Sequence, residues 1–426
     1  MTLTPWAQRL LDAPRSVDVT ALHVNDTVAA FFAGAPTQEG RELARLYGAD
    51  NDLAKRTAAA AAITRSSECD DIHLASCVTP GAVVIPVALA YGQNCAREAF
   101  EHAIAGGYAV GLRLGLAIGG VHALAAGVWP TLLAAPVMAA VTTSCLKGRD
   151  ANTLAHAIAS ALAVSDGRIG RPKPPGRWLA LGDAVLKGVR AAEAAANGAR
   201  SDLLILSKPW LSARAGHDNI AMDTFDSPKG PSILDVDFKA FPIARQAMNA
   251  VIAFQQMTAN GLDPRRIESV EVFVPAANVA LLSRPLLDDD RLSRLCNIGF
   301  QLACAALAPD QLYDCERVVR ADLRNFAQRV TVAASDELEE HLPDHWPARI
   351  VVHAGSDTIT RTVFGTLFDH DVPGLSQRLA EKWRTLLPAD AQLLLDTHGV
   401  NGAVANRHAM LWQAIERRVS MAAKEG

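Results

Sequence analysis

The spacing of apolar residues predicts helices over the first half of the chain. From residue 20 to about residue 197, alanine-rich segments repeat apolar side chains every three or four positions, and glycines separate these segments. No convincing strand pattern interrupts this stretch. Two capped amphipathic segments, at 150–158 and 178–196, are joined through the proline-rich segment 168–175, which we expect to be extended.

One of the predicted helices carries a glycine at every fourth position. Gly107, Gly111, Gly115 and Gly119 fall on a single helix face, where a neighbouring helix can approach closely. Arg113 stands in the middle of the same segment, and its charge argues against a lipid-facing helix. We therefore expect a tightly packed bundle in which Arg113 points to a partner or a cavity.

After a stretch without periodicity at 199–235, the pattern changes to short alternating segments. Strands are predicted at 267–274, 329–333, 348–353 and 358–363, with helices at 244–259, 291–307 and 375–387 among them. Several connections are short, so we expect an antiparallel sheet. The last segment, 389–424, returns to helix. The predicted fold class is therefore mainly α, with a smaller α+β domain.

Composition limits the classes of partner. The chain has 426 residues, half of them hydrophobic, which is enough apolar material for a large core and for two domains. Its net charge is −4, and its lysines and arginines are scattered, so we expect no nucleic-acid partner. Seven cysteines without a CxxC pair are typical of reduced thiols, which predicts a cytoplasmic protein.

The sequence predicts neither a secretion signal nor a membrane span. Residues 1–15 lack the sustained apolar core of a signal peptide. The longest apolar run, at 131–146, is interrupted by Pro136 and falls short of the length that crosses a bilayer. We expect a buried helix there and no membrane partner.

The most distinctive polar feature is the acidic segment ECDDIH at 68–73, which precedes an apolar run at 82–90. Between them, Thr79 is a good N-cap residue and Pro80 fits the first helical position, so the apolar run is predicted to be a buried helix. Three carboxylates and an imidazole held against a core form a candidate active site. Taken alone, such a short cluster is more typical of helix capping.

Familiar catalytic motifs are absent from the sequence, which has no Walker A loop, no GxGxxG after a strand, no HExxH and no GxSxG elbow. A metal site built from Asp70, Asp71 and His73 would need distant ligands, so no metal is predicted. A second candidate is Lys239, because a lysine at a domain boundary can bind a carboxylate or transfer a proton. Composition alone favours a solvated linker lysine at this position.

The order of these segments resembles the MmgE/PrpD family, the family of 2-methylcitrate dehydratase. Each matching segment is short, but together they follow the family order over nearly the whole chain. They are ECDDIH with TPGAVVIPVALA, GYAVGLRLG at 107–115, AGVWPTLLAAPVMAA at 126–140, GRWLALGDAVLKGV at 176–189, FKAFP at 238–242 and FGTLFD at 364–369.

The resemblance implies an all-helical domain made of residues 1–235 and 389–426, an α+β lid made of residues 236–388, and a homodimer. Members include dehydratases, decarboxylases and epimerases of small polycarboxylates that use neither a metal nor an organic cofactor. Their common step is proton movement beside a carboxylate, in a cleft between the helical domain and the lid. On this basis Glu68, His73 and Lys239 are the candidate catalytic residues.

Family positions with a different residue in this chain occur throughout these segments, and several of the changes replace a polar group with an apolar or bulky one. Glu68 stands for an aspartate, Ile72 for a threonine, Thr79, Trp129, Ala180 and Met248 for histidines, Arg177 for a lysine and Gln301 for a tyrosine. We therefore expect a drier pocket, suited to a small and relatively apolar organic acid rather than a tricarboxylate. The predicted substrate-binding residues are Asp71, Thr79, Arg113, Trp129, Arg177, Met248 and Gln301.

Three functions are compatible with this sequence. The first is a lyase that removes water or carbon dioxide, with Glu68 or His73 as the base and with Lys239 and Arg177 binding the substrate carboxylate. The second is an isomerase or cyclase of specialised metabolism, in which positioning within a dry cavity supplies much of the rate. The third is a non-catalytic scaffold relative.

Overall fold

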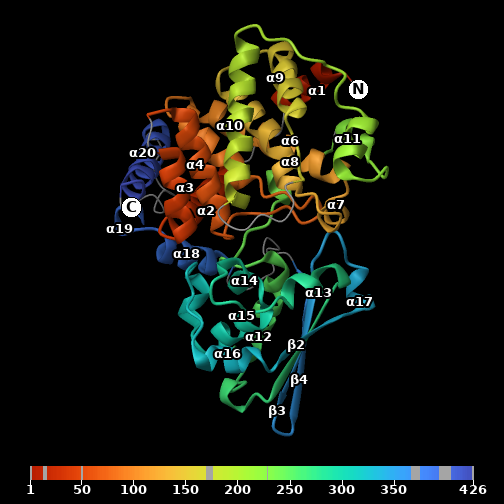
Figure 1. The fold of residues 1–426 in the computed structure, drawn as a ribbon, viewed down its shortest axis with the longest axis vertical. Helices are drawn as coiled ribbons and strands as arrows, with labels where there is room; N and C mark the ends of the chain where they lie inside the picture. Colours follow the sequence, from red (N-terminus) through yellow and green to blue (C-terminus); the bar gives the residue numbers. More distant parts are fainter. Residues whose placement is uncertain are drawn as a thin grey trace. The chain divides into compact units, whose positions relative to one another are not determined.

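The computed structural model describes residues 2–12, 17–48, 51–168, 176–227, 229–365, 375–392 and 404–424. The chain divides into two compact units (Figure 1). The first combines Met1–Val236 with Leu386–Gly426, and the second is Asp237–Thr385. Residues 169–175 of the predicted extended segment lie outside the described residues.

The first unit is entirely helical in its described part. Its α-helices are α1 (Leu3–Leu11), α2 (Val17–Gly34), α3 (Gln38–Gly48), α4 (Leu53–Ser66), α5 (Gly81–Tyr91), α6 (Arg97–Ala117), α7 (Val121–Ala125), α8 (Pro130–Leu146), α9 (Ala151–Ala163), α10 (Gly176–Ala196), α11 (Lys208–Ala215), α19 (Ala389–Gln392) and α20 (Val404–Ala422), with the 3₁₀ turns η1 (Met222–Phe225) and η2 (Ile233–Asp235).

The centre of this unit is formed by the two helices that are apolar on every face. Every residue of α8 is buried, and so is every residue of α5 except the last. Helices α6 and α10 pack against α8, and α4, α6 and α8 pack against α5. The expectation of a buried helix at 131–146 is thus confirmed. None of the helices in the described ranges is long and apolar enough to span a membrane.

The glycine-rich face of α6 allows the close packing that was predicted, but only over part of its length. A Cβ atom would lie 2.3 Å from Thr142 Oγ1 if added to Gly107, and 2.3 Å from Met138 Sδ if added to Gly111. Gly115 instead contacts the loop before α5, and Gly119 lies beyond the end of α6 with a φ of +80°. The prediction of one helix face therefore holds for Gly107, Gly111 and Gly115 and is wrong for Gly119, and the close approach of a neighbouring helix is found at Gly107 and Gly111.

The second unit contains a small sheet with helices packed on it. Its strands are β1 (Ser269–Val274), β2 (Val330–Ala334), β3 (Ala348–Ala354) and β4 (Asp357–Val363). Its helices are α12 (Arg245–Ala259), α13 (Ala276–Leu282), α14 (Arg291–Cys296), α15 (Ile298–Leu307), α16 (Ala321–Ala327), α17 (Asp336–Glu339) and α18 (Leu375–Leu386), with the 3₁₀ turns η3 (Pro264–Arg266) and η4 (Pro309–Tyr313).

The sheet has the strand order β2-β1-β3-β4 and is mixed. Strands β1, β3 and β4 are antiparallel neighbours, whereas β2 runs parallel to β1, with Val270 opposite Val330. The expectation of an antiparallel sheet is therefore wrong for β2. The reason is the long connection between β1 and β2, which contains α13 to α16 and returns the chain to the same end of the sheet. The four predicted strands and the fold class itself are confirmed.

Candidate active site

The acidic segment lies in the loop between α4 and α5, and the backbone of this loop is unusual. Glu68 has a φ of 56° and Cys77 a φ of 54°, and in the described part of the chain these are the only non-glycine residues with a positive φ. Such conformations cost about 1–3 kcal/mol each and persist where the surrounding structure holds them in place. Both non-glycine residues with a positive φ in the described ranges are thus found in one loop.

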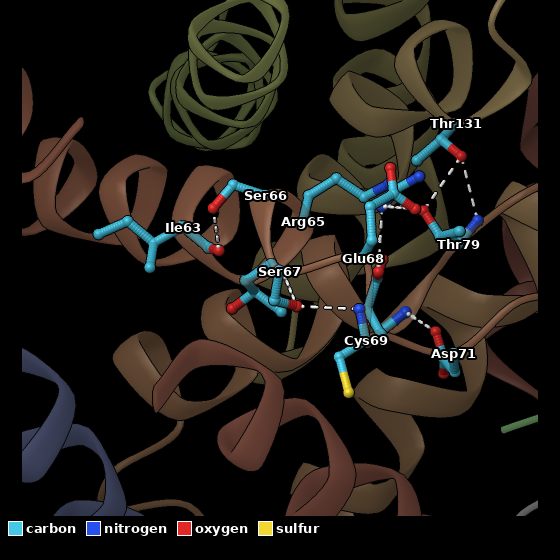
Figure 2. Close-up of polar contacts among 12 residues, drawn as sticks. Ile63, Arg65, Ser66, Ser67, Glu68, Cys69, Asp71, Thr79 and Thr131 are labelled. Carbon is cyan, nitrogen blue, oxygen red and sulfur yellow. Dashed lines mark hydrogen bonds and ion pairs between the residues drawn. The ribbon is translucent and has the colours of Figure 1, made fainter. Parts of the chain in front are cut away.

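Local hydrogen bonds give the loop its shape (Figure 2). Ser67 Oγ donates to the carbonyl oxygen of Thr64 at 2.7 Å and accepts the Cys69 N–H at 3.0 Å. His73 pairs with Val78 through a backbone bridge, and its Nδ1 accepts the Ser76 N–H at 3.2 Å. Because Nδ1 is an acceptor, a neutral His73 carries its proton on Nε2.

Asp71 is fully buried and joins the loop to three helices. Its Oδ1 accepts the N–H of Gly81, the first residue of α5, at 2.8 Å. Its Oδ2 accepts the Tyr108 hydroxyl of α6 at 2.6 Å and lies 2.8 Å from His23 Nδ1 of α2. All four of these groups lie in the first unit.

The expectation that Thr79 caps α5 is wrong. Pro80 takes the N-cap position with helical angles and no side-chain cap, so the first free N–H belongs to Gly81 and is bound by Asp71. The side chain of Thr79 turns elsewhere. Its hydroxyl lies 3.2 Å from Thr131 Oγ1, and its N–H donates to the same oxygen at 3.1 Å (Figure 2).

Arg65, at the end of α4, holds two carboxylates of the loop. Its guanidinium lies 3.0 Å from Glu68 Oε2 and 3.1 Å from Asp70 Oδ1. The three side chains are buried or nearly so, and such charge-assisted contacts are strong away from water. Figure 2 shows Arg65 and Glu68 together beside Thr79.

Two tryptophans surround this ion-pair cluster. The guanidinium of Arg177 lies 4.3 Å from the ring centre of Trp129, and that of Arg65 lies 5.4 Å from the ring centre of Trp178. The two indoles meet edge to face, with 6.1 Å between their centres. Of the predicted site residues, Glu68, Trp129 and Arg177 are thus brought together around Arg65.

Arg65 and Trp178 were not predicted as site residues. The sequence does hold a signal for Arg65, because it stands three positions before Glu68, where the end of a helix brings the two side chains together. Trp178 follows Arg177 directly in the first turn of α10.

Arg113 forms its contacts outside this cluster. Its guanidinium donates to the carbonyl oxygen of Ser227 at 3.0 Å and to that of Thr224, and so ties the chain around η1 to α6. Burial, and then the nearby charge of Arg9, lower the pKa of Arg113. The described contacts of Arg113 are therefore structural.

The remaining predicted site residues belong to the second unit. Lys239 is buried, and its carbonyl oxygen accepts a hydrogen bond from Lys382 Nζ at 2.7 Å. Met248 lies in the core of this unit, where its sulfur accepts the Ala240 N–H at 3.3 Å. Gln301 is also buried, and its Oε1 accepts from Arg317 at 2.8 Å.

No three His, Cys, Asp or Glu side chains in the described ranges are arranged to hold a metal ion. The side chains around Arg65 include carboxylates and a second guanidinium group, which can transfer a proton and bind an anion.

Two family models match successive parts of the chain. Residues 7–219 match the model of the MmgE/PrpD N-terminal domain, and residues 241–392 match the model of the MmgE/PrpD C-terminal domain. No curated protein matches the chain. The two domain matches follow one another in order and cover most of the sequence, so the chain belongs to the MmgE/PrpD family.

Proposed function

We propose that the protein is a lyase that acts by proton transfer next to the carboxylate of a small, relatively apolar organic acid. Members of the MmgE/PrpD family are dehydratases or decarboxylases of organic acids. Proton movement beside a carboxylate requires a positioned base and cations that stabilise the developing negative charge. We assign these roles to residues around the loop between α4 and α5.

The observation that carries the proposal is the position of Glu68. Its backbone is held in a strained conformation, and its carboxylate lies 3.0 Å from the guanidinium of Arg65. The guanidinium of Arg177 lies over the ring of Trp129, the centre of which is also 5.8 Å from the guanidinium of Arg65. A carboxylate fixed next to one guanidinium group, with a second guanidinium packed on a neighbouring indole, combines a base with a binding site for a substrate carboxylate.

In the proposed dehydration, Glu68 takes a proton from the carbon next to the substrate carboxylate. The electron pair of that C–H bond forms the new double bond, and the C–O bond on the neighbouring carbon breaks. The departing hydroxide takes a proton from the imidazolium form of His73 and leaves as water, and after product release Glu68 loses its proton to solvent while His73 regains one. Arg65 and Arg177 hold the substrate carboxylate, on which negative charge accumulates. We propose that Lys239 is a third cation that binds the substrate carboxylate.

The expected substrate is small and relatively apolar because of the residues around the arginines. Trp129 and Trp178 offer broad apolar faces, and Thr79 contributes one hydroxyl, which is occupied with Thr131. A second or third substrate carboxylate would need further donors, since a buried charge without a partner is costly.

The test begins with metabolite profiles of cells with and without the gene, which identify the substrate. Turnover of that compound is then measured for Glu68→Gln and for Asp70→Asn. Both variants remove one carboxylate from Arg65, but only the first removes the proposed base. We expect Glu68→Gln to lower kcat about 10²–10⁴-fold, and Asp70→Asn to lower it less than about tenfold.

Each other outcome points to a definite alternative. Equal loss in the two variants would assign the effect to the ion-pair cluster and contradict Glu68 as the base. Full activity of both Glu68→Gln and Lys239→Ala, with native circular dichroism spectra, would remove both catalytic assignments. A product with the same mass as the substrate would support the isomerase or cyclase. An unchanged metabolite profile would support the scaffold.

A further inference from the structure

We propose that Tyr108 and His23 are positioning residues that hold Glu68 in its reactive place through Asp71. The contacts that carry this role are those of Tyr108 and His23 with Asp71. The inference rests on the proposed function, in which Glu68 is the base, and it adds a buried network to that site.

The network joins four separate parts of the first unit at one carboxylate. Tyr108 comes from α6, His23 from α2 and Gly81 from the start of α5, and all three contact Asp71 within 2.6–2.8 Å. The side chains of Asp71 and His23 have no exposed surface. A carboxylate with three N–H or O–H partners in a buried place is fixed in position.

The hydroxyl of Tyr108 is the donor in its contact with Asp71. Burial first, and then the negative charge of Asp71, raise the pKa of Tyr108 well above its usual value. This direction favours the protonated hydroxyl, which donates to Asp71. The short contact between His23 and Asp71 likewise requires the proton of His23 on Nδ1.

The fit around Asp71 is also tight. A Cβ atom added to Gly81 would lie 2.7 Å from Asp71 Oδ1 and 2.7 Å from Thr27 Oγ1. The carboxylate thus has little room to move while α5 and α2 stay in place. Since α5 and α8 are the buried centre of the unit, Asp71 is tied to its most rigid part.

Asp71 stands three residues after Glu68, so fixing Asp71 also restricts the backbone at Glu68. The backbone at Glu68 is strained, with a φ of 56°, and a strained residue relaxes unless its flanks are fixed. The N-terminal flank is fixed by Ser67, which bonds the last turn of α4 and the N–H of Cys69. The C-terminal flank is fixed by Asp71, and we infer that this attachment keeps Glu68 next to Arg65.

The chain offers a matched control for this idea. Tyr47 is a second buried tyrosine of the first unit whose hydroxyl donates to an aspartate, Asp183, at 2.7 Å. Burial and Asp183 raise the pKa of Tyr47 too. Tyr47→Phe and Tyr108→Phe therefore remove the same kind of hydrogen bond, but only the second removes it from Asp71.

The experiment compares these two variants by hydrogen exchange and by turnover. In Tyr108→Phe, we expect the amides of residues 67–73 to exchange at least about tenfold faster than in the wild type. We also expect kcat to fall at least about tenfold while KM changes less than about threefold, because the base moves and the cations stay. Tyr47→Phe should leave the exchange of 67–73 and kcat within about twofold of the wild type.

A second pair of variants keeps the test independent of folding defects. Asn at position 23 can place a donor near the site of His Nδ1, whereas Leu cannot. We expect His23→Asn to retain more kcat than His23→Leu. If Tyr108→Phe and Tyr47→Phe behave alike, or if the two His23 variants are equally active, the positioning role is wrong. Full activity of Glu68→Gln would instead refute the proposed function itself, whatever the Tyr108 variant does.

Discussion

Arg65 contacts two carboxylates at once, and this arrangement affects how substitutions near Glu68 should be interpreted. Its guanidinium is 3.0 Å from Glu68 and 3.1 Å from Asp70. Removing either carboxylate leaves the other in contact with the arginine, so neither variant leaves Arg65 without a counter-charge. Breaking a buried pair outright is much more costly, about 3–5 kcal/mol. Glu68→Gln and Asp70→Asn are thus informative because neither breaks all the contacts of Arg65.

A second residue-scale feature predicts a pH effect on stability. The ring of His408 stacks on Phe100, with 3.5 Å between the ring centres. Burial first, and then the charges of Arg407 and Arg97, lower the pKa of His408 from 6.5 to about 4. Between these two pH values the unfolded chain binds a proton at this histidine and the native protein does not. The contribution of His408 to stability is therefore complete above pH 6.5 and declines as the pH falls toward 4.

The measurement is urea unfolding of the wild type and of His408→Phe, which keeps a ring on Phe100. Carboxylates lower the stability of both proteins in acid. Between pH 7 and pH 5, however, the wild type should lose about 2 kcal/mol more than the variant. Parallel losses in the two proteins would show that His408 titrates normally in the native state.

Some contacts of the site could be anticipated from the sequence, and others could not. The pairing of Arg65 with Glu68 follows from their spacing at the end of a helix. The partners of Asp71 do not, because His23 is 48 residues and Tyr108 is 37 residues away along the chain. Only the packing of α2, α5 and α6 brings them together, and no local pattern reports that packing.

At the scale of elements, close helix packing around α8 limits the size of the side chains that fit on α6. Gly107 and Gly106 are neighbours in α6 but face different surroundings. A Cβ atom on Gly107 would approach Thr142 Oγ1 to 2.3 Å and both methyl groups of Val84 to 2.9 Å. On Gly106 its nearest neighbour would be the carbonyl oxygen of Leu10, at 3.3 Å.

We therefore expect two adjacent substitutions to differ in their effect on stability. Gly106→Ala should change stability by less than about 1 kcal/mol, because the gain in helix propensity offsets the tighter contact. Gly107→Ala should destabilise the protein by about 1–3 kcal/mol, because α6 must move away from α8 and α5. Denaturant unfolding of the two variants measures the difference. Equal stability of both would show that α6 is not packed against α8 as described.

Local patterns predicted the elements well and their pairing less well. The period of two placed the four strands within two residues of their observed ends, as for β3 at Ala348–Ala354. The direction of β2 was missed because it depends on the crossover that contains α13 to α16, not on the strand itself. The residue that caps α5 was also missed, because it depends on a contact between distant positions. Asp71 stands ten residues before Gly81 and accepts its N–H.

At the scale of the molecule, the chain contains two compact units, each with a core of its own. The core of the second unit lies within Ala240–Ala354 and includes one face of the sheet together with residues of α12 and α15. The first unit is discontinuous in sequence, because it also contains α20, which packs on α3 and α5. The family resemblance also implies a homodimer, and sedimentation equilibrium would measure the mass of the assembly in solution.

The continuous second unit should fold without the rest of the chain. Its apolar core belongs to residues within Asp237–Thr385. Expressed alone, these residues should give a mixed helix and strand circular dichroism spectrum and a cooperative thermal transition. Val272→Asp, which places a charge in this core, should abolish the transition, whereas Glu271→Gln on the exposed side of β1 should keep it. A non-cooperative melt of the unsubstituted unit would contradict an independent core.

Proton transfer by Glu68 is the central claim, and hydrogen isotope exchange tests it most directly. The substrate found by metabolite comparison is incubated in D₂O with wild-type enzyme, Glu68→Gln or Asp70→Asn, and deuterium at the carbon next to the carboxylate is followed by NMR in recovered substrate and product. We predict that the wild type and Asp70→Asn exchange or remove this proton, and that Glu68→Gln does so about 10²–10⁴-fold more slowly. Equal rates for Glu68→Gln and the wild type would contradict the account.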